Sequence, residues 1–157
     1  MRPEDIPAVQ QAARRTWSHT YDGVIPEPVQ EKFLARAYSE AALERRMERD
    51  FFLVAEIDGE VVGFADFQPI SRAEVYLGAI YILPEHQSVG VGQRLLKAGI
   101  EKFPTSAKIT LNVERGNDRA RRFYEAHGFR VIGGSTEDLF GHESHELQMA
   151  CENRGSK

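Results

Sequence analysis

Residues 80–103 read IYILPEHQSVGVGQRLLKAGIEKF, in which an apolar strand, a glycine-rich loop and an amphipathic helix follow one another directly. Pro84 marks the end of the strand. From Val91 to Phe103, apolar residues recur at spacings of three and four, which predicts a helix. Between the two, Gly90-x-Gly92 lets the backbone turn tightly and brings successive N–H groups together at a helix N-terminus. These donors and the helix dipole attract anions, and a pyrophosphate suits them.

Two other phosphate-binding loops do not fit this stretch. A Walker A loop needs Lys and then Ser or Thr after its last glycine, whereas Gln93-Arg94 follows Gly92. A Rossmann fingerprint needs a third glycine where this chain has Leu95. A Gly-x-Gly pair by itself is equally compatible with an ordinary helix start, so its meaning depends on the flanking elements.

Toward the N-terminus, helical periodicity changes to strand periodicity near residue 50. The pattern predicts helices over residues 5–21, from Pro28 onward, and from a Ser39 cap to Arg49. Strands are predicted over residues 51–57 and 60–68. The Asp58-Gly59 pair between them is typical of a type I′ hairpin turn.

Toward the C-terminus, a long strand is predicted over residues 73–83, where Gly78 indicates a bulge or a close backbone approach. The pattern then predicts a strand over 108–113, a helix over 117–127 that Gly128 ends, and strands over 129–132 and 145–150. Residues 152–157 are expected to fray. Because no repeat, linker or low-complexity tract is present, residues 1–157 are expected to form a single α/β domain.

The composition is that of a soluble globular protein with a formal net charge of −4. This mild acidity argues against a nucleic-acid-binding surface and is compatible with a cationic substrate. No apolar run reaches the length of a membrane span. Cys151 is the one cysteine, which fits a reducing compartment and leads us to expect a cytoplasmic protein. His142, Glu143 and His145 have no evident further ligands, so no metal site is expected.

A second motif lies at residues 111–129, LNVERGNDRARRFYEAHGF. Here a strand is followed by an asparagine-capped helix and then by Tyr124-x-x-x-Gly128-Phe129. Together with Gln87-x-x-Gly90-x-Gly92, this motif resembles the acetyl-CoA-binding signature of the GNAT superfamily of N-acetyltransferases. The opening Thr16-Trp17-x-x-Thr20-Tyr21 resembles the PaiA-like polyamine acetyltransferases and the RimI-like branch.

The resemblance implies the GNAT acyl-CoA N-acyltransferase fold, a twisted mixed sheet with a splayed central strand pair and helices on both faces. Acetyl-CoA would be the co-substrate, with its pantetheine arm in the splay beside Ile80, Tyr81 and Ile82. The pyrophosphate would be held by N–H groups of the loop and first helical turn, at Gln87, Ser88, Val89, Gly90, Val91, Gly92 and Gln93. Asn117 would contact the cofactor near the pantetheine arm while it also caps its helix.

The chemistry explains why these residue types are needed. A neutral amine attacks the thioester carbonyl, and a free N–H at the strand bulge suits the developing oxyanion. By the resemblance, Tyr124 would point at the thioester sulfur and donate a proton to the leaving thiolate. Its position on the helix alone would favour a core tyrosine beside Phe123. The ammonium form of the substrate must lose a proton first, and Glu74 is the candidate base, acting through water; a solvated charge at the start of a strand is the alternative.

Trp17, His19 and Tyr21 lie where the first helices of the family cover the acceptor site, so they are the candidate substrate-binding residues. Trp17 also fits a core position, and His19 a surface position. The arginine pairs 45–46 and 121–122 are expected on solvated helix faces, from which one residue of the second pair could reach the 3′-phosphate of the cofactor.

The sequence therefore predicts an N-acetyltransferase that moves acetyl from acetyl-CoA to a primary amine by direct attack in a ternary complex. The acceptor classes, in order, are a small amine such as a polyamine, a protein amino group and an antibiotic amine. A GNAT module that binds acyl-CoA as a non-catalytic sensor is the alternative, and a homodimer is left open. The family usually opens with a strand, for which residues 1–3 leave no room, so either that strand is missing or the sheet begins at Phe51.

Overall fold

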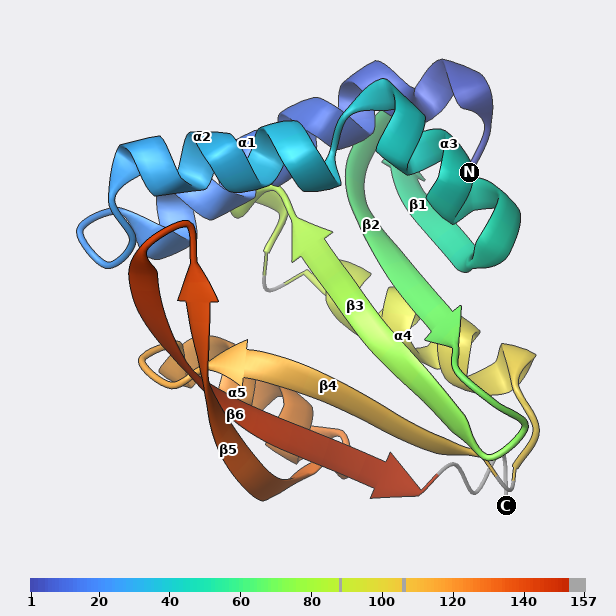
Figure 1. The fold of residues 1–157 in the computed structure, drawn as a ribbon. Helices are drawn as coiled ribbons and strands as arrows, with labels where there is room; N and C mark the ends of the chain where they lie inside the picture. Colours follow the sequence, from blue (N-terminus) through green and yellow to red (C-terminus); the bar gives the residue numbers. More distant parts are fainter. Residues whose placement is uncertain (88, 106, 153–157) are drawn as a thin grey trace.

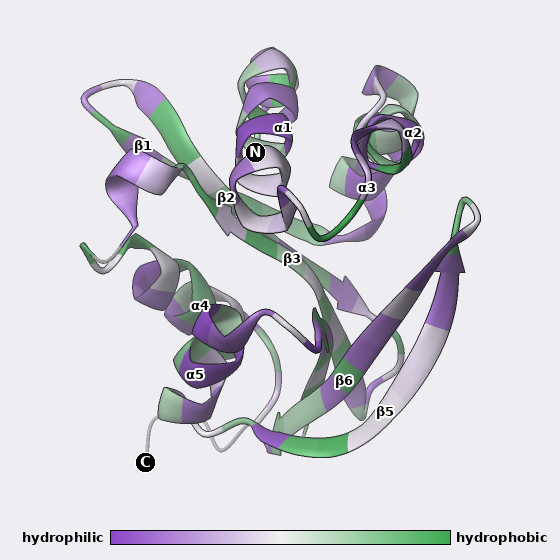
Figure 2. Cartoon of the chain, turned by 90° about the vertical axis from the view of Figure 1, so that its left-hand side faces the viewer, coloured by the Kyte–Doolittle hydropathy of each residue, from purple (hydrophilic) through white to green (hydrophobic). Residues whose placement is uncertain are grey.

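The computed structural model describes residues 1–87, 89–105 and 107–152. Within these ranges, six strands form one mixed sheet in the order β1-β2-β3-β4-β6-β5 (Figure 1). Helices α1–α3 cover one face of the sheet, and α4 and α5 cover the other (Figure 2). The mixed α/β architecture with helices on both faces is the one predicted from the sequence.

The N-terminal layer consists of η1 (Pro3–Asp5), α1 (Ile6–Tyr21), α2 (Glu27–Ala37) and α3 (Glu40–Arg49). Ser39 caps α3, as predicted, because its hydroxyl accepts from the Ala42 N–H at 3.1 Å. The buried face of α1 includes Val9, Ala13 and Trp17, which belong to the same apolar cluster as Phe64 of the sheet. The sheet of the described residues begins with β1 (Phe51–Ile57), so no earlier strand covers its edge.

The first hairpin joins β1 to β2 (Glu60–Pro69) through Asp58 and Gly59. Both turn residues have positive φ, 52° and 81°, as a type I′ turn requires. The predicted hairpin is therefore confirmed with its turn residues.

Strand β3 (Glu74–Ile82) contains the predicted irregularity at Gly78. Asp66 of β2 pairs with Ala79 and Phe67 with Leu77, so Gly78 is the extra residue of a bulge. The bulge changes which face each side chain joins. Leu77 packs with α4 and α5, whereas Ala79, two residues later, packs with the N-terminal helices.

The central strands separate beyond this bulge. Strand β4 (Lys108–Glu114) pairs with β3 in parallel, but the register runs from Glu74↔Lys108 to Tyr76↔Thr110 and no further. Figure 1 shows the two strands diverging from that shared end. Between them in sequence lie η2 (Pro84–His86), where only a loop was expected, and α4 (Val91–Lys102). The predicted splayed strand pair is thus present.

The C-terminal hairpin is much longer than the sequence predicted. After α5 (Asp118–Ala126), β5 runs over Arg130–Leu139 and β6 over His142–Glu152. The expected strands, 129–132 and 145–150, were too short because the outer part of the hairpin is largely solvent-exposed and lacks apolar alternation. The turn places Phe140 at φ 50° and Gly141 at φ 87°. Near it, Leu139 packs against the N-terminal helical layer.

The two faces of the sheet carry separate apolar clusters. Phe67 and Leu96 belong to the cluster under α4 and α5, and Phe64 to the cluster under α1–α3. Gly99 of α4 lies so close to Phe67 that a Cβ added there would meet the Phe67 ring at 2.0 Å. This close approach holds α4, and with it the glycine loop that precedes it, against the sheet.

Candidate active site

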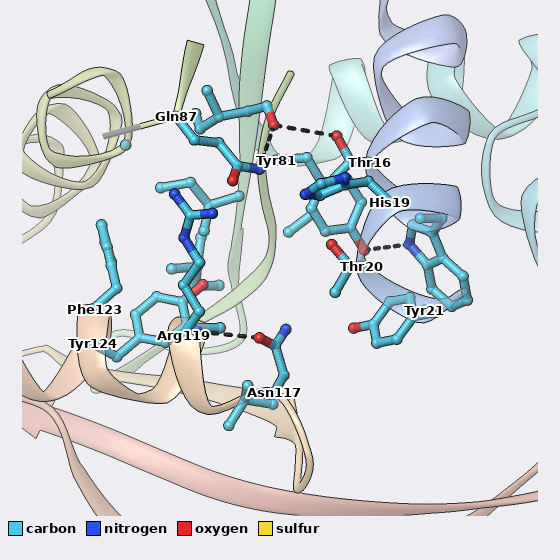
Figure 3. A pocket seen from close by; sticks show the side chains of 18 of the residues that line it. Thr16, His19, Thr20, Tyr21, Tyr81, Gln87, Asn117, Arg119, Phe123 and Tyr124 are labelled. Atoms are coloured by element: carbon cyan, nitrogen blue, oxygen red, sulfur yellow. Dashed lines mark hydrogen bonds between the residues drawn. The ribbon is translucent and has the colours of Figure 1, made fainter. Parts of the chain in front are cut away.

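The splay between β3 and β4 opens into a cavity of about 520 Å³. Its walls come from the second half of α1, the part of β3 from the bulge onward, β4, the first turn of α4 and the start of α5. Figure 3 shows these side chains converging on one space from elements far apart in the sequence. Of the candidate residues, Trp17, His19, Tyr21, Ile80, Tyr81, Ile82, Gln87, Gly92, Asn117 and Tyr124 line it.

The glycine loop forms the N-terminus of α4. Gly90 is the N-cap residue with φ 88°, a left-handed conformation that a side chain would strain. The first i→i−4 bond of the helix runs from the Arg94 N–H to the Gly90 carbonyl at 3.1 Å. The preceding N–H groups, those of Val91, Gly92 and Gln93, therefore have no acceptor within the helix. Val89 is 67% exposed beside them, and Ser88 lies outside the described residues.

Gly92 is required by packing as well as by the loop. A Cβ at this position would meet the Phe123 ring of α5 at 3.3 Å. The absence of a side chain therefore lets α4 and α5 approach each other at the cavity wall.

Gln87 has a role that the sequence did not indicate. Its side-chain amide donates to the Ile82 carbonyl at 3.0 Å, and the Thr16 hydroxyl approaches the same oxygen at 3.4 Å. The Ile82 carbonyl is thus already occupied, and Gln87 ties the loop to the end of β3. Figure 3 draws both bonds.

Tyr124 of α5 lies deep in the cavity wall, with 8% of its surface exposed. Burial, and then the neighbouring Tyr81, Tyr21 and Tyr76, raise the pKa of its hydroxyl well above the usual value. Among the described residues, no group forms a hydrogen bond with this hydroxyl. Tyr124 is therefore a protonated donor that faces the cavity.

Asn117 combines two roles, because it both caps α5 and lines the cavity. Its side-chain oxygen accepts from the Ala120 N–H at 3.2 Å, which confirms the predicted cap. Its side chain also interacts with the Tyr21 hydroxyl of α1. Burial raises the pKa of Tyr21, and the interaction with Asn117 opposes that increase.

On α1, Trp17 is buried and His19 is exposed, and both line the cavity. The Trp17 indole N–H donates to the Tyr81 hydroxyl at 2.8 Å. The Trp17 ring also stacks on Phe33 of α2, with ring centroids 4.1 Å apart. Trp17 therefore serves as a core residue and as a wall of the site at the same time.

Glu74 is not brought to the cavity. It lies at the first position of β3, where the two central strands still pair. Its carboxylate lies 3.8 Å from the Lys108 ammonium and accepts from the Thr110 hydroxyl at 3.3 Å. Its contacts are thus those of a residue that joins β3 to β4.

A different set of carboxylates lies beside the α1 side of the cavity. Glu114 of β4 lies opposite Glu146 of β6 in the strand register. After burial and Tyr81, these two carboxylates also raise the pKa of the Tyr21 hydroxyl. Burial first, then Glu137 and Glu114, raise the pKa of Glu146. Sequence reasoning missed this set, because the three residues meet only through the β4-β6-β5 strand order.

The cavity also holds Arg119 of α5 and Asn112 of β4, neither of which the sequence had indicated. Arg121, by contrast, forms ion pairs with Asp118 and Glu125 of its own helix.

Within the described ranges, no three His, Cys, Asp or Glu side chains are grouped to hold a metal ion. Nor does any helix there have the length and apolarity to cross a membrane.

Comparison with known proteins agrees with this geometry. The chain matches the acetyltransferase (GNAT) family over residues 7–129. It is 27% identical over 151 residues to the spermidine N(1)-acetyltransferase of Thermoplasma acidophilum, covering 91% of this chain and 93% of that protein. It is 33% identical over 131 residues to an uncharacterised N-acetyltransferase of Archaeoglobus fulgidus, covering 77% of this chain and 88% of that one.

Solved structures show the same likeness. The PaiA N-acetyltransferase of Thermoplasma acidophilum, in complex with coenzyme A, has a TM-score of 0.81 at 26% identity, over 97% of this chain and 95% of that chain. The ribosomal-protein-S18-alanine N-acetyltransferase of Escherichia coli shares the fold, with a TM-score of 0.75 at 21% identity over 100% and 93% of the two chains.

These matches cover most of the chain. The protein is an acyltransferase, and it belongs to the GNAT family of acetyl-CoA-dependent N-acetyltransferases, as its two motifs predicted.

Proposed function

We propose that this chain acetylates a primary amine of a small cationic acceptor, with a polyamine as the first candidate, by direct attack on acetyl-CoA in a ternary complex. The observation that carries the proposal is the cavity in the β3–β4 splay, which is lined by the first turn of α4, by Tyr124 and by Tyr21, with Glu114 and Glu146 acting on the Tyr21 hydroxyl from behind. We treat residues 1–157 as one catalytic domain. The similarity to a spermidine N(1)-acetyltransferase over nearly the whole chain supports this choice of acceptor.

In this proposal the pantetheine arm of acetyl-CoA lies in the splay, against the backbone of Ile80 and Tyr81. Because the Ile82 carbonyl is already occupied, only its N–H could take part. The pyrophosphate binds at the start of α4, where the N–H groups of Val91, Gly92 and Gln93 have no intrahelical acceptor. The Gly90 turn and the remaining loop residues, Ser88 among them, complete the cradle.

The thioester then lies between two hydrogen-bond donors. Backbone N–H groups at the Gly78 bulge, which β4 no longer pairs, suit the oxyanion that forms on the carbonyl. The Tyr124 hydroxyl donates its proton to the departing thiolate as the carbon–sulfur bond breaks. The raised pKa of Tyr124 keeps that hydroxyl protonated at neutral pH.

The acceptor enters beside Trp17, His19 and Tyr21. The Glu114–Glu146 pair favours a cationic acceptor there, since two carboxylates attract an ammonium group. We assign the base to Glu146, acting through water, in preference to Glu74, which is engaged with Lys108. A raised pKa makes a carboxylate a better proton acceptor near neutral pH.

The test is release of the coenzyme A thiol from acetyl-CoA in the presence of single amines, with spermidine first and the product identified by mass spectrometry. The proposal predicts one acetyl group transferred per thiol released. Double-reciprocal plots with both substrates varied should intersect, because no acyl-enzyme forms. Acetyl-CoA binding without turnover on any amine would contradict the proposal and favour a sensor. Parallel plots would contradict direct attack.

A further inference from the structure

A chain of polar side chains runs from the cavity wall into the apolar layer beneath α1–α3. It begins at Trp17, whose indole N–H donates to Tyr81 at 2.8 Å, and both residues line the cavity. The Tyr81 hydroxyl interacts with that of Tyr38, at the end of α2, and Tyr38 interacts with Arg46 of α3. Arg46 lies over the Tyr38 ring, with its guanidinium carbon 4.6 Å from the centroid.

The chain ends at a fully buried carboxyl group. Arg46 Nε donates to Asp66 Oδ2 at 2.8 Å, and Asp66 is 0% exposed in the middle of β2. Arg46 was expected on a solvated helix face, and that expectation is wrong, because its side chain is only 13% exposed. On the neighbouring strands, Asp66 pairs with Phe52 of β1 and with Ala79 of β3. Both are apolar, so neither adds a charge beside Asp66.

The other carboxylate oxygen of Asp66, Oδ1, is buried as well. Oδ1 has no hydrogen-bond donor in the described part of the chain. The Asp50 side chain interacts with the Asp66 carboxyl group, and it is itself 0% exposed and bonded to Arg49 at 2.8 Å. Two interacting buried carboxylates repel each other when both are ionised, whereas a proton on Asp66 Oδ1 removes that repulsion and makes this oxygen a donor.

We propose that Asp50 and Asp66 share one proton, and that Asp66 is a positioning residue which holds the Trp17 wall of the acceptor site through Arg46, Tyr38 and Tyr81. When that proton is lost, repulsion between the carboxylates displaces Asp66 and loosens the polar chain. The groups that act on the pair are Arg46 and Arg49 from α3 and Tyr38 at the end of α2. Burial first, and then the Asp50 contact, raise the pKa of Asp66 to about 7, while Arg46 opposes them.

The test compares Asp66→Asn, which imitates the protonated carboxyl group, with Asp66→Ala, which removes it. The amide can donate to Asp50 and accept from Arg46, so the asparagine variant keeps the network at every pH. We expect the alanine variant to raise the acceptor KM by about tenfold, with the acetyl-CoA KM changed by less than about twofold. The ratio of the wild-type acceptor KM to that of the asparagine variant should increase from pH 6 to pH 8.5, and this ratio cancels the titration of the amine itself. Glu44→Gln, the same chemical change at an exposed site of α3, is the matched control.

The kinetic part of this inference rests on the proposed function, so a second readout is independent of turnover. The carboxyl carbon of Asp66, followed by NMR in the free protein, should titrate near neutral pH and shift when Asp50 is replaced by Asn. Titration of Asp66 in the ordinary acidic range, or equal damage from Asp66→Asn and Asp66→Ala, would overturn the proton pair. An absence of turnover with intact titration would instead refute the proposed function and leave the proton pair in place.

Discussion

The proposed cofactor side and the proposed acceptor side of the cavity are built in different ways. The cofactor side comes from consecutive segments, β3, the glycine loop and α4, and it uses backbone N–H groups and a glycine at positive φ. The proposed acceptor side is lined by side chains of α1 and β4, and Glu146 of the β5–β6 hairpin acts on it through Tyr21. A short motif can therefore encode the cofactor site, whereas the acceptor site depends on the relative placement of distant elements.

The largest effect is expected where the two sides meet. In the proposed mechanism the Tyr124 hydroxyl protonates the thiolate, so Tyr124→Phe should lower kcat by about a hundredfold. Affinity for acetyl-CoA should stay within about twofold, because backbone groups bind the cofactor. Steady-state kinetics and calorimetry measure these two quantities. Tyr76→Phe, at a β3 tyrosine outside the cavity wall, is the control. A Tyr124→Phe enzyme with full kcat would exclude Tyr124 as the general acid.

A smaller effect is expected on the acceptor side alone. Glu146→Gln should lower kcat/KM for spermidine by about tenfold and leave acetyl-CoA binding unchanged. Because a base must be ionised to act, wild-type kcat/KM rises with pH through the pKa of Glu146, which lies above the usual carboxyl value. The variant should lose that acid limb in a pH–rate profile. The exposed Glu143→Gln on the same strand should retain it, and equal profiles for all three proteins would refute Glu146 as the base.

The stability of the fold should depend on pH through Asp66. Its pKa of about 7 in the folded protein lies above the value of about 4 expected in the unfolded chain, so the folded state binds the extra proton between these values. The free energy of unfolding should therefore decrease as pH rises from about 4 to about 7, by up to about 1.4 kcal/mol per unit from this group. Urea unfolding of wild type and Asp66→Asn checks this. The difference between them should change across that interval and be constant above it.

The smallest effect separates a helix cap from a cofactor contact. Asn117→Ala and Ser39→Ala each remove one N-cap bond, so each should lower the free energy of unfolding by about 1 kcal/mol. Only Asn117→Ala should also weaken acetyl-CoA binding, since Asn117 lines the cavity and Ser39 does not. Equal acetyl-CoA affinity in the two variants would mean that Asn117 acts only as a helix cap.

The same contrast explains which features could be predicted. The Asp58-Gly59 turn, the Ser39 and Asn117 caps and the Gly78 bulge depend on local backbone preferences, and each is present. The lengths of β5 and β6 could not be predicted, because the outer part of the hairpin is largely exposed and carries no apolar alternation. Glu146 and Asp66 gave no signal either. Their roles arise from strand order, register and burial, which a linear pattern does not contain.

The most direct test of the cofactor site is isothermal titration of acetyl-CoA into wild type, Gly90→Ala and Gly90→Glu. Both variants strain the same left-handed position, where a Cβ would meet nothing within 4 Å, but only glutamate adds a negative charge beside the pyrophosphate cradle. We predict micromolar binding to wild type, weaker binding to the alanine variant and none to the glutamate variant. Equal binding by all three proteins, or no binding by wild type, would contradict a cofactor site at the start of α4.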